Sequence, residues 1–143
     1  MILCAEDDPD DRILLRDAAV ESLLGRVEFV EDGEQALAYL RRQGSYADPE
    51  RSPRPSFVLL DLNMPKVDGR QVLEAMKQDA TLRSIPVVIL TTSSAAWDVS
   101  QSYRMGANSY IAKPVTYAGL VKVTQMLRDY WLEMVELPSE TVV

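Results

Sequence analysis

Short apolar runs of strand length alternate along the chain with longer segments of helical periodicity. The third and fourth runs are continuously apolar, which is typical of central parallel strands that are covered on both faces. The predicted strands are Met1–Ala5, Val27–Val30, Phe57–Leu60, Pro86–Leu90 and Asn108–Ala112.

Helical patterns fill the gaps between these strands. The first helix is expected to begin after Asp8, a favourable N-cap, with Pro9 at the first helical position. Three further helices are expected over residues 34–42, around Val72–Met76, and over residues 95–105. The last begins near Thr116, and a single apolar stripe predicts that it is long. That stripe consists of Leu120, Val123, Leu127, Tyr130 or Trp131, and Met134.

Five strand–helix alternations predict an α/β domain, with a doubly wound, five-stranded parallel sheet and helices on both faces. We expect this domain over residues 1–135, followed by a short tail over residues 136–143. The segment Gly44–Pro55 contains three prolines and is expected to be a surface loop before the third strand.

The charge and hydropathy of the chain limit its partners. The formal net charge is −7 and Arg41-Arg42 is the only basic doublet, so neither nucleic acid nor an anionic membrane is an expected partner. No apolar run approaches the roughly 20 residues of a membrane span, and Met1–Ala5 is too short for a signal peptide. We therefore expect a cytoplasmic protein.

Cysteine and histidine usage narrows the chemistry. The single cysteine, Cys4, cannot form an internal disulfide, and its apolar surroundings predict an inert, buried thiol. The chain has no histidine, which excludes a Ser-His-Asp triad, a histidine general base and a phosphohistidine carried by this chain. Any chemistry must come from carboxylates, lysine, hydroxyl groups and a metal.

Polar residues stand where the predicted strands end. Glu6, Asp7 and Asp8 follow the first strand, and the later strands end in Asp61, Thr91-Thr92-Ser93 and Lys113-Pro114. The carboxyl ends of parallel strands form one crevice, so these groups are expected to meet there. Crowded carboxylates repel unless a cation offsets them, and Mg²⁺ with oxygen ligands is the natural candidate.

The remaining groups suit phosphate chemistry. Asp61 is the candidate nucleophile, because carboxylates form aspartyl phosphates and because a charge after four apolar residues needs a partner. Lys113 and Thr91 are expected to bind phosphate oxygens. Each motif alone has a simpler explanation, as a helix cap, a turn or a strand end. We assign Asp8, Asp10 and Asp11 to a solvated helix cap.

Five ordered motifs resemble the receiver domains of two-component response regulators, over about Ile2 to Trp131. They are Ile2–Asp8, Leu59–Pro65 with Asp68-Gly69, Val88–Thr91, Gly106-Ala107 with Tyr110, and Lys113-Pro114. The resemblance implies the flavodoxin-like (βα)5 receiver fold, with strand order 2-1-3-4-5.

The resemblance also implies the roles of the site residues. Asp61 would be the phosphoacceptor, and Thr91 and Lys113 would bind the phosphoryl group. Mg²⁺ would be held by Asp7 directly, by Glu6 through water, by Asp61, and by the main-chain carbonyl group of Asn63. Tyr110 would be an aromatic switch that turns inward as Thr91 moves toward the phosphate. Asn63 and Ser93 stand at positions that tune hydrolysis in this family, and neither is an acid or a base, so some self-dephosphorylation is expected.

The partners follow from the same resemblance. The phosphoryl donor would be a sensor histidine kinase. The loop Gly44–Pro55 and the long last helix resemble the small regulators that partner bacterial phytochromes, which implies a light-regulated kinase. With no effector domain after the receiver, output is expected through an unidentified downstream protein or onward phosphotransfer.

Aromatic and apolar residues on the fourth and fifth helices cannot all face the sheet, so we expect a homodimer there. The expected interface residues are Trp97, Val99, Tyr117, Val121 and Trp131. The alternative is core packing with a few ordinary exposed apolar side chains.

Two other classes of protein share part of this pattern. A haloacid-dehalogenase-type phosphatase also uses an aspartate nucleophile, but it has an acid where this chain has Asn63, and its metal-binding acids follow the fourth strand. A phosphorylation-independent binding module usually loses the acidic pair, the acceptor or the lysine, and all are present here. The sequence leaves open whether the protein shuttles phosphate or acts by changing shape. It is expected to be no enzyme beyond phosphotransfer to itself and its own dephosphorylation.

Overall fold

The computed structural model describes residues 1–138, and residues 139–143 lie outside the description. Five parallel strands form one sheet in the order β2-β1-β3-β4-β5, which confirms the predicted doubly wound topology. The strands are β1 (Ile2–Ala5), β2 (Val27–Val30), β3 (Phe57–Leu60), β4 (Val87–Thr91) and β5 (Ser109–Ala112). Each lies within one residue of its prediction at either end.

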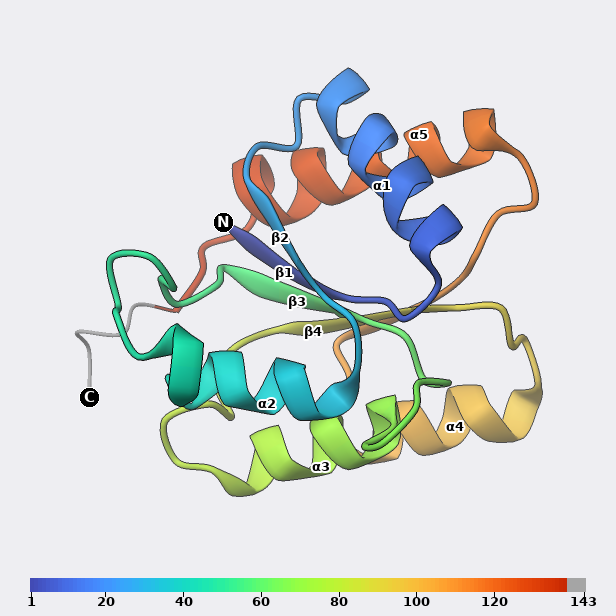
Figure 1. The fold of residues 1–143 in the computed structure, drawn as a ribbon. Helices are drawn as coiled ribbons and strands as arrows, with labels where there is room; N and C mark the ends of the chain where they lie inside the picture. Colours follow the sequence, from blue (N-terminus) through green and yellow to red (C-terminus); the bar gives the residue numbers. More distant parts are fainter. Residues whose placement is uncertain (139–143) are drawn as a thin grey trace.

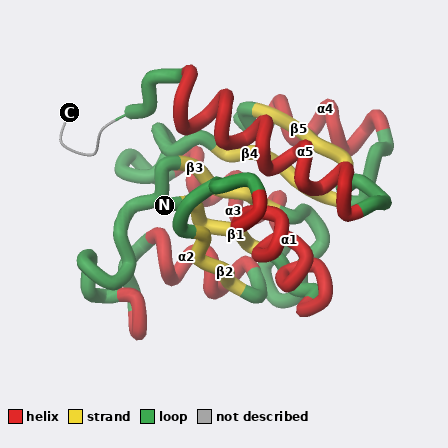
Figure 2. Tube along the Cα trace, turned by 90° about the horizontal axis from the view of Figure 1, so that it is seen from above, coloured by secondary structure: helices red, strands yellow, loops and turns green. Residues whose placement is uncertain are grey.

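Helices cover both faces of the sheet (Figure 1). On one face, α5 lies beside α1, and α2, α3 and α4 cover the other (Figures 1 and 2). The helices are α1 (Pro9–Glu21), α2 (Gly33–Leu40), α3 (Gly69–Gln78), α4 (Ala96–Arg104) and α5 (Tyr117–Leu127). Within residues 1–138, no helix is long and apolar enough to cross a membrane.

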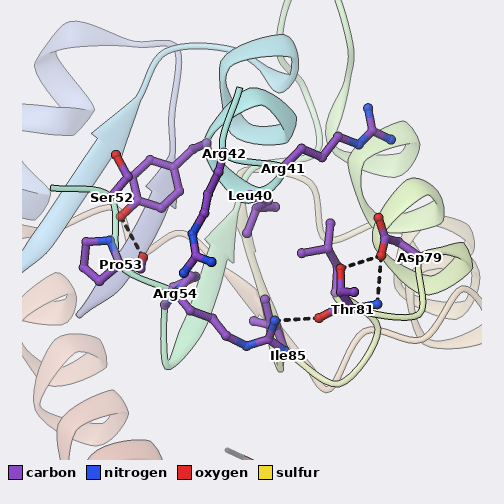
Figure 3. Close-up of a pocket in the computed structure, with 12 residues that line it drawn as sticks. Leu40, Arg41, Arg42, Ser52, Pro53, Arg54, Asp79, Thr81 and Ile85 are labelled. Atoms are coloured by element: carbon purple, nitrogen blue, oxygen red, sulfur yellow. Dashed lines mark hydrogen bonds between the residues drawn. The ribbon is translucent and has the colours of Figure 1, made fainter. Parts of the chain in front are cut away.

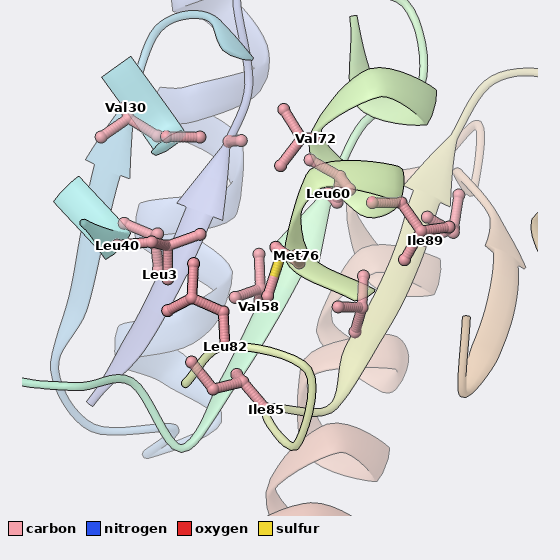
Figure 4. Close-up of a cluster of buried hydrophobic side chains, with 14 of the residues drawn as sticks. Leu3, Val30, Leu40, Val58, Leu60, Val72, Met76, Leu82, Ile85 and Ile89 are labelled. Carbon is pink, nitrogen blue, oxygen red and sulfur yellow. The ribbon is translucent and has the colours of Figure 1, made fainter. Parts of the chain in front are cut away.

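Alternate residues of each central strand serve opposite faces of the sheet. In β1, Leu3 packs in the cluster beneath α2 and α3, whereas Ile2 and Cys4 pack in the cluster beneath α1 and α5. Figure 4 shows the first cluster, where Leu3, Val58 and Leu60 meet side chains of α2 and α3. Cys4 is buried, and burial raises the pKa of its thiol, in keeping with the inert cysteine expected from the sequence.

Two helix ends differ from the sequence prediction. α2 ends at Leu40 and not at residue 42, because Arg42 adopts a left-handed backbone conformation with φ of 52°. The last helix changes to π-helical geometry over Arg128–Met134. The wider turn leaves Trp131 against the ring of Phe57, with centroids 5.8 Å apart, but exposes Met134, which we had placed in the apolar stripe. The expected tail over residues 136–143 lies mostly outside the described residues.

The register of the sheet positions the candidate site. Ala5 of β1 pairs with Leu60 of β3, so Glu6 and Asp61 leave their strands side by side. Further along the same sheet, Thr91 at the end of β4 pairs with Ala112 of β5, and Lys113 follows β5 directly. Four polar positions far apart in the sequence therefore reach the same edge of the sheet.

Candidate functional site

The ammonium group of Lys113 joins two buried carboxylates at the carboxyl edge of the sheet. Its Nζ lies 2.7 Å from Oε2 of Glu6 and 2.9 Å from Oδ2 of Asp61. The Glu6 side chain is only 2% exposed and that of Asp61 only 8%. Buried carboxylates need such a partner, because the desolvation of an isolated charge is costly.

Both carboxylate oxygens of Asp61 have polar partners. While Oδ2 faces Lys113, Oδ1 accepts hydrogen bonds from the Thr91 hydroxyl group at 2.8 Å and from the backbone N–H of Asn63 at 3.1 Å. Thr91 is fully buried and its carbonyl oxygen accepts the N–H of Lys113 at 2.7 Å, so the two residues are also joined through the backbone. The carboxylate of Asp61 is therefore fixed in one orientation by three different segments.

Gly69 fixes the segment that carries Asp61 and Asn63. Its N–H donates to the Leu62 carbonyl oxygen at 2.9 Å, and a Cβ there would overlap the carbonyl oxygen of Asp61. Asp68 and Gln71 form a capping box at the same end of α3. Only glycine permits the start of α3 to approach the end of β3 this closely.

Glu6, Asp7 and Asp61 can share a metal ion. Each offers a carboxylate oxygen, and these three oxygens lie within 4.8 Å of one another. Arg12 holds the turn between β1 and α1, since its Nη1 donates to the carbonyl oxygens of Glu6 at 2.8 Å and Asp7 at 3.0 Å. The all-oxygen donor set fits a hard divalent cation such as Mg²⁺.

The pKa values of the three central groups shift together. Burial raises the pKa of Glu6 to about 8, and hydrogen bonding with Asp61 adds to the rise. Burial opposes ionisation of Asp61 as well, but hydrogen bonds with Glu6 and Lys113 outweigh it, so the pKa of Asp61 is lowered. Burial also disfavours the charge of Lys113, yet its hydrogen bonds to both carboxylates hold the lysine pKa above its ordinary value. Asp61 is thus ionised, and Glu6 is the carboxylate that takes up a proton first.

Asp11 belongs to the site, so the sequence prediction that it lies in a solvated helix cap is wrong. Its Oδ2 lies 3.1 Å from Nζ of Lys113, and its side chain is only 35% exposed. The cap itself is confirmed at Asp8, whose carboxylate accepts the N–H groups of Asp10 and Asp11. Asp11 lies three residues after this cap, in the first turn of α1, and that offset was the available signal for a side chain turned toward the strand ends.

Tyr110 and Ser93 lie in a polar network beside the site. The Tyr110 hydroxyl group donates to the Ser93 carbonyl oxygen at 2.8 Å, and its ring packs against the core cluster beneath α3. The Ser93 hydroxyl group donates to Asp98 at 2.6 Å, and Asp98 also receives Arg70 of α3 at 2.6 Å. The segment after β4 is therefore tied to α3, α4 and β5.

The five residues expected at a dimer interface fall into two groups. Trp97 is 65% exposed and Tyr117 is 40% exposed. Val121 and Trp131 instead pack against the core cluster beneath α1 and α5, and Val99 is half-buried. Core packing thus explains part of the pattern that suggested an interface.

The shifted pKa of Glu6 predicts a distinctive pH dependence in the absence of divalent metal. Between the ordinary value of 4.5 and about 8, the unfolded chain loses the Glu6 proton that the native state keeps. The free energy of unfolding should therefore fall as pH rises through this window, by up to about 1 kcal/mol per pH unit. The shifts of Asp61 and Lys113 act outside it, below 3.8 and above 10.5.

Urea denaturation in a chelator across this window measures the effect, with Glu6→Gln as the comparison. The variant should lack this decline, so that its stability relative to the unmodified protein improves with pH. Parallel pH curves for the two proteins would contradict the assignment.

Comparisons with known proteins agree with this geometry. The family model described as the response regulator receiver domain matches residues 2–125. The response regulator Rcp1 of Synechocystis sp. is 42% identical over 140 residues, which cover 97% of this chain and 93% of Rcp1. The Mn²⁺-bound structure of Rcp1 has a TM-score of 0.86, with 96% of this chain and 98% of that chain covered.

Two further solved structures are similar over almost the whole chain. The response regulator RPA3017 in red light signaling of R. palustris is 37% identical, with a TM-score of 0.91 and coverage of 96% of this chain and 97% of that one. The phosphorylated cyanobacterial phytochrome response regulator RcpA is 41% identical, with a TM-score of 0.88 and the same coverage. The chain belongs to the family of response-regulator receiver domains.

Proposed function

We propose that this receiver accepts a phosphoryl group on Asp61 from the phosphohistidine of a sensor histidine kinase and then signals through a change of shape or by onward phosphotransfer. The observation that carries the proposal is the fixed carboxylate of Asp61, bonded by Lys113 and Thr91 and lying beside Glu6 and Asp7. A signalling protein of the receiver family fits this site better than an enzyme that turns over a separate substrate.

Each residue has a distinct part in the proposed transfer. An oxygen of ionised Asp61 attacks the phosphorus atom, a P–O bond forms, and the P–N bond to the kinase histidine breaks as the imidazole leaves. Lys113 already contacts Asp61 and is placed to pair with a phosphoryl oxygen, while the Thr91 hydroxyl group can turn from the carboxylate to another oxygen.

The acidic group at the strand ends would hold Mg²⁺. Glu6, Asp7 and Asp61 would supply carboxylate oxygens, directly or through water, and the main-chain carbonyl group of Asn63 is the further ligand that the family resemblance implies. When bound, Mg²⁺ supplies positive charge that offsets the carboxylates and the incoming phosphoryl oxygens.

Tyr110 would report phosphorylation to the surface. Movement of Thr91 toward a phosphoryl group would shift the segment after β4, and Ser93 in that segment accepts the Tyr110 hydroxyl group through its carbonyl oxygen. Asn63 is exposed and Ser93 is half-buried, and neither side chain is an acid or a base that would activate water. Some self-dephosphorylation is part of the proposal.

The similarity to RPA3017 and RcpA supports a phytochrome-type kinase as the phosphoryl donor. Those proteins are described as regulators in red light signaling and as a phytochrome response regulator, and this chain matches each of them over 96% of its length. The phosphorylated protein would then act on a downstream protein or pass the phosphoryl group to a phosphotransfer domain.

Intact-protein mass after brief incubation with a small acyl phosphate tests the acceptor. We expect one phosphoryl adduct that requires Mg²⁺ and is absent in Asp61→Asn. Asp10→Asn is the matched control, since Asp10 is an exposed acid in the first turn of α1 and should leave the adduct unchanged. An unmodified chain would contradict the proposal and favour a binding module, whereas an adduct that survives in Asp61→Asn would contradict Asp61 as the acceptor.

We also propose a homodimer through α4, β5 and α5, built chiefly on exposed Trp97 and Tyr117. Light scattering at micromolar concentration should give the mass of two chains, and Trp97→Ala should shift the population toward one chain. Val20→Ala removes a comparably exposed side chain from α1 and should not. A mass of one chain for the protein without substitutions, both before and after phosphorylation, would refute the dimer.

A further inference from the structure

An ion pair beside the site joins the start of α3 to the start of α4. Nη2 of Arg70 lies 2.6 Å from Oδ1 of Asp98, and Oδ2 of Asp98 accepts the Ser93 hydroxyl group at 2.6 Å. We call these three residues the α3–α4 bridge. The phosphoryl transfer proposed above gives neither Arg70 nor Asp98 a part.

The bridge is better shielded from water than an ordinary surface ion pair. The side chains of Arg70 and Asp98 are 28% and 17% exposed. Those of Arg26 and Glu28, which pair at 2.8 Å beside β2, are 50% and 41% exposed. Water screens exposed pairs, so they fix little, whereas a shielded carboxylate with partners on both oxygens is held in one geometry. The hydrogen bonds from Ser93 and Arg70 also lower the pKa of Asp98, so this carboxylate is charged at neutral pH.

Few other contacts fix the start of α4. Its N-cap residue is Ala95, which has no side-chain oxygen to accept a helix N–H, and Ser102 is the one fully buried residue of the helix. An acid that only offset the dipole of α4 would need neither an arginine from α3 nor a serine from the preceding segment as a partner. We infer that the bridge determines where this end of α4 lies.

The start of α3, in contrast, is fixed to the segment that carries Asp61. Gly69 packs so closely on this segment that a Cβ would overlap the Asp61 carbonyl oxygen, and its N–H donates to the Leu62 carbonyl oxygen at 2.9 Å. Arg70 follows Gly69 directly in α3. The ion pair therefore connects a firmly fixed helix start to a loosely packed one.

The bridge also holds the hydrogen-bond partner of Tyr110. While Asp98 holds the Ser93 hydroxyl group, the Ser93 carbonyl oxygen accepts the Tyr110 hydroxyl group at 2.8 Å. The backbone N–H of Tyr110 donates to the hydroxyl group of Tyr103, in the last turn of α4, at 3.1 Å. Tyr110 is thus bonded both to the segment that precedes α4 and to α4 itself, and its position depends on how that helix is held.

We propose that Arg70 and Asp98 are positioning residues for Tyr110, and that the response of α4 and β5 to phosphorylation of Asp61 passes through the α3–α4 bridge. The second part rests on the proposed function. When Thr91 turns toward a phosphoryl oxygen, the segment after β4 moves, and the bridge makes the start of α4 move with it. Acceptance of the phosphoryl group does not need the bridge, because the backbone of Thr91 is held by the N–H of Lys113 at 2.7 Å.

The tyrosine ring signals in NMR spectra of the metal-free protein test the positioning without any phosphoryl chemistry. Asp98→Ala and Arg70→Ala should each shift or broaden the Tyr110 ring signals, which are identified by their loss in Tyr110→Phe. The double variant should resemble Asp98→Ala, since Arg70 acts through Asp98. Glu28→Ala removes the exposed pair with Arg26 and should leave these signals unchanged. Unchanged Tyr110 signals in both bridge variants would overturn the positioning role.

Amide NMR shifts on addition of Mg²⁺ and beryllium fluoride, a stable stand-in for the phosphoryl group, test the response. The protein without substitutions and Glu28→Ala should both show shifts at Thr91 and at Tyr110. In Asp98→Ala the Thr91 shift should persist, while the Tyr110 shift should fall at least about threefold, because the two ends of the segment are no longer coupled.

A full Tyr110 shift in Asp98→Ala would overturn this route for the response, and so would a loss of the Thr91 shift in that variant, since acceptance itself would then need the bridge. No shift at Thr91 in the protein without substitutions would instead contradict the proposed function and, with it, the second part of the inference. The spectra of the metal-free protein would still decide whether Arg70 and Asp98 position Tyr110.

Discussion

The contact of the Lys113 ammonium group with the carboxylates of Glu6 and Asp61 is the interaction on which the rest of the site depends. Four acidic side chains gather where β1, β3 and α1 meet, and the two buried ones, Glu6 and Asp61, would be strongly destabilising without a cation. Lys113 supplies that cation at distances of 2.7 to 3.1 Å from three of them. It holds Asp61 ionised, which a phosphoryl acceptor requires.

The same arrangement explains how a local event would reach the surface. Thr91 bonds Asp61 through its side chain and Lys113 through its backbone, so any ligand on Asp61 changes the contacts of both. Beyond Thr91, Ser93 links the end of β4 to Tyr110 of β5 and to Asp98 of α4. Asp61, the end of β4 and the face formed by α4 and β5 are thus connected by a continuous chain of hydrogen bonds.

Most of the fold and of the site could be predicted from the sequence, because both depend on strands. Continuous apolar runs located β3 and β4, and the polar residue after each run then had to lie at the same edge of the sheet. Asp11 was missed because helical acids near an N-cap usually face solvent, and its offset from the cap is a weaker signal than that expectation until the position of Lys113 is known. The division of exposed and packed aromatics likewise needed coordinates, since periodicity did not reveal the π-helical turns that place Trp131 on Phe57.

The end of α2 shows the same limit of sequence prediction in another form. Arg41-Arg42 was visible as a doublet, but the sequence could not show that Arg42 leaves the helix in a left-handed conformation while Arg41 points outward (Figure 3). Such positions depend on where a helix ends, and helix ends are the least certain part of a sequence prediction.

The central proposal is that Asp61, Thr91 and Lys113, together with the acidic residues Glu6 and Asp7, form one phosphoryl-accepting site. A crystal structure with Mg²⁺ and beryllium fluoride, which mimics a phosphoryl group on a carboxylate, tests it most directly. We expect the beryllium on an Asp61 oxygen, its fluorines in contact with Lys113 and Thr91, and the metal on Asp7 and Asp61. A well-ordered structure with metal at those carboxylates and no beryllium fluoride on Asp61, or with it bound elsewhere, would contradict the account.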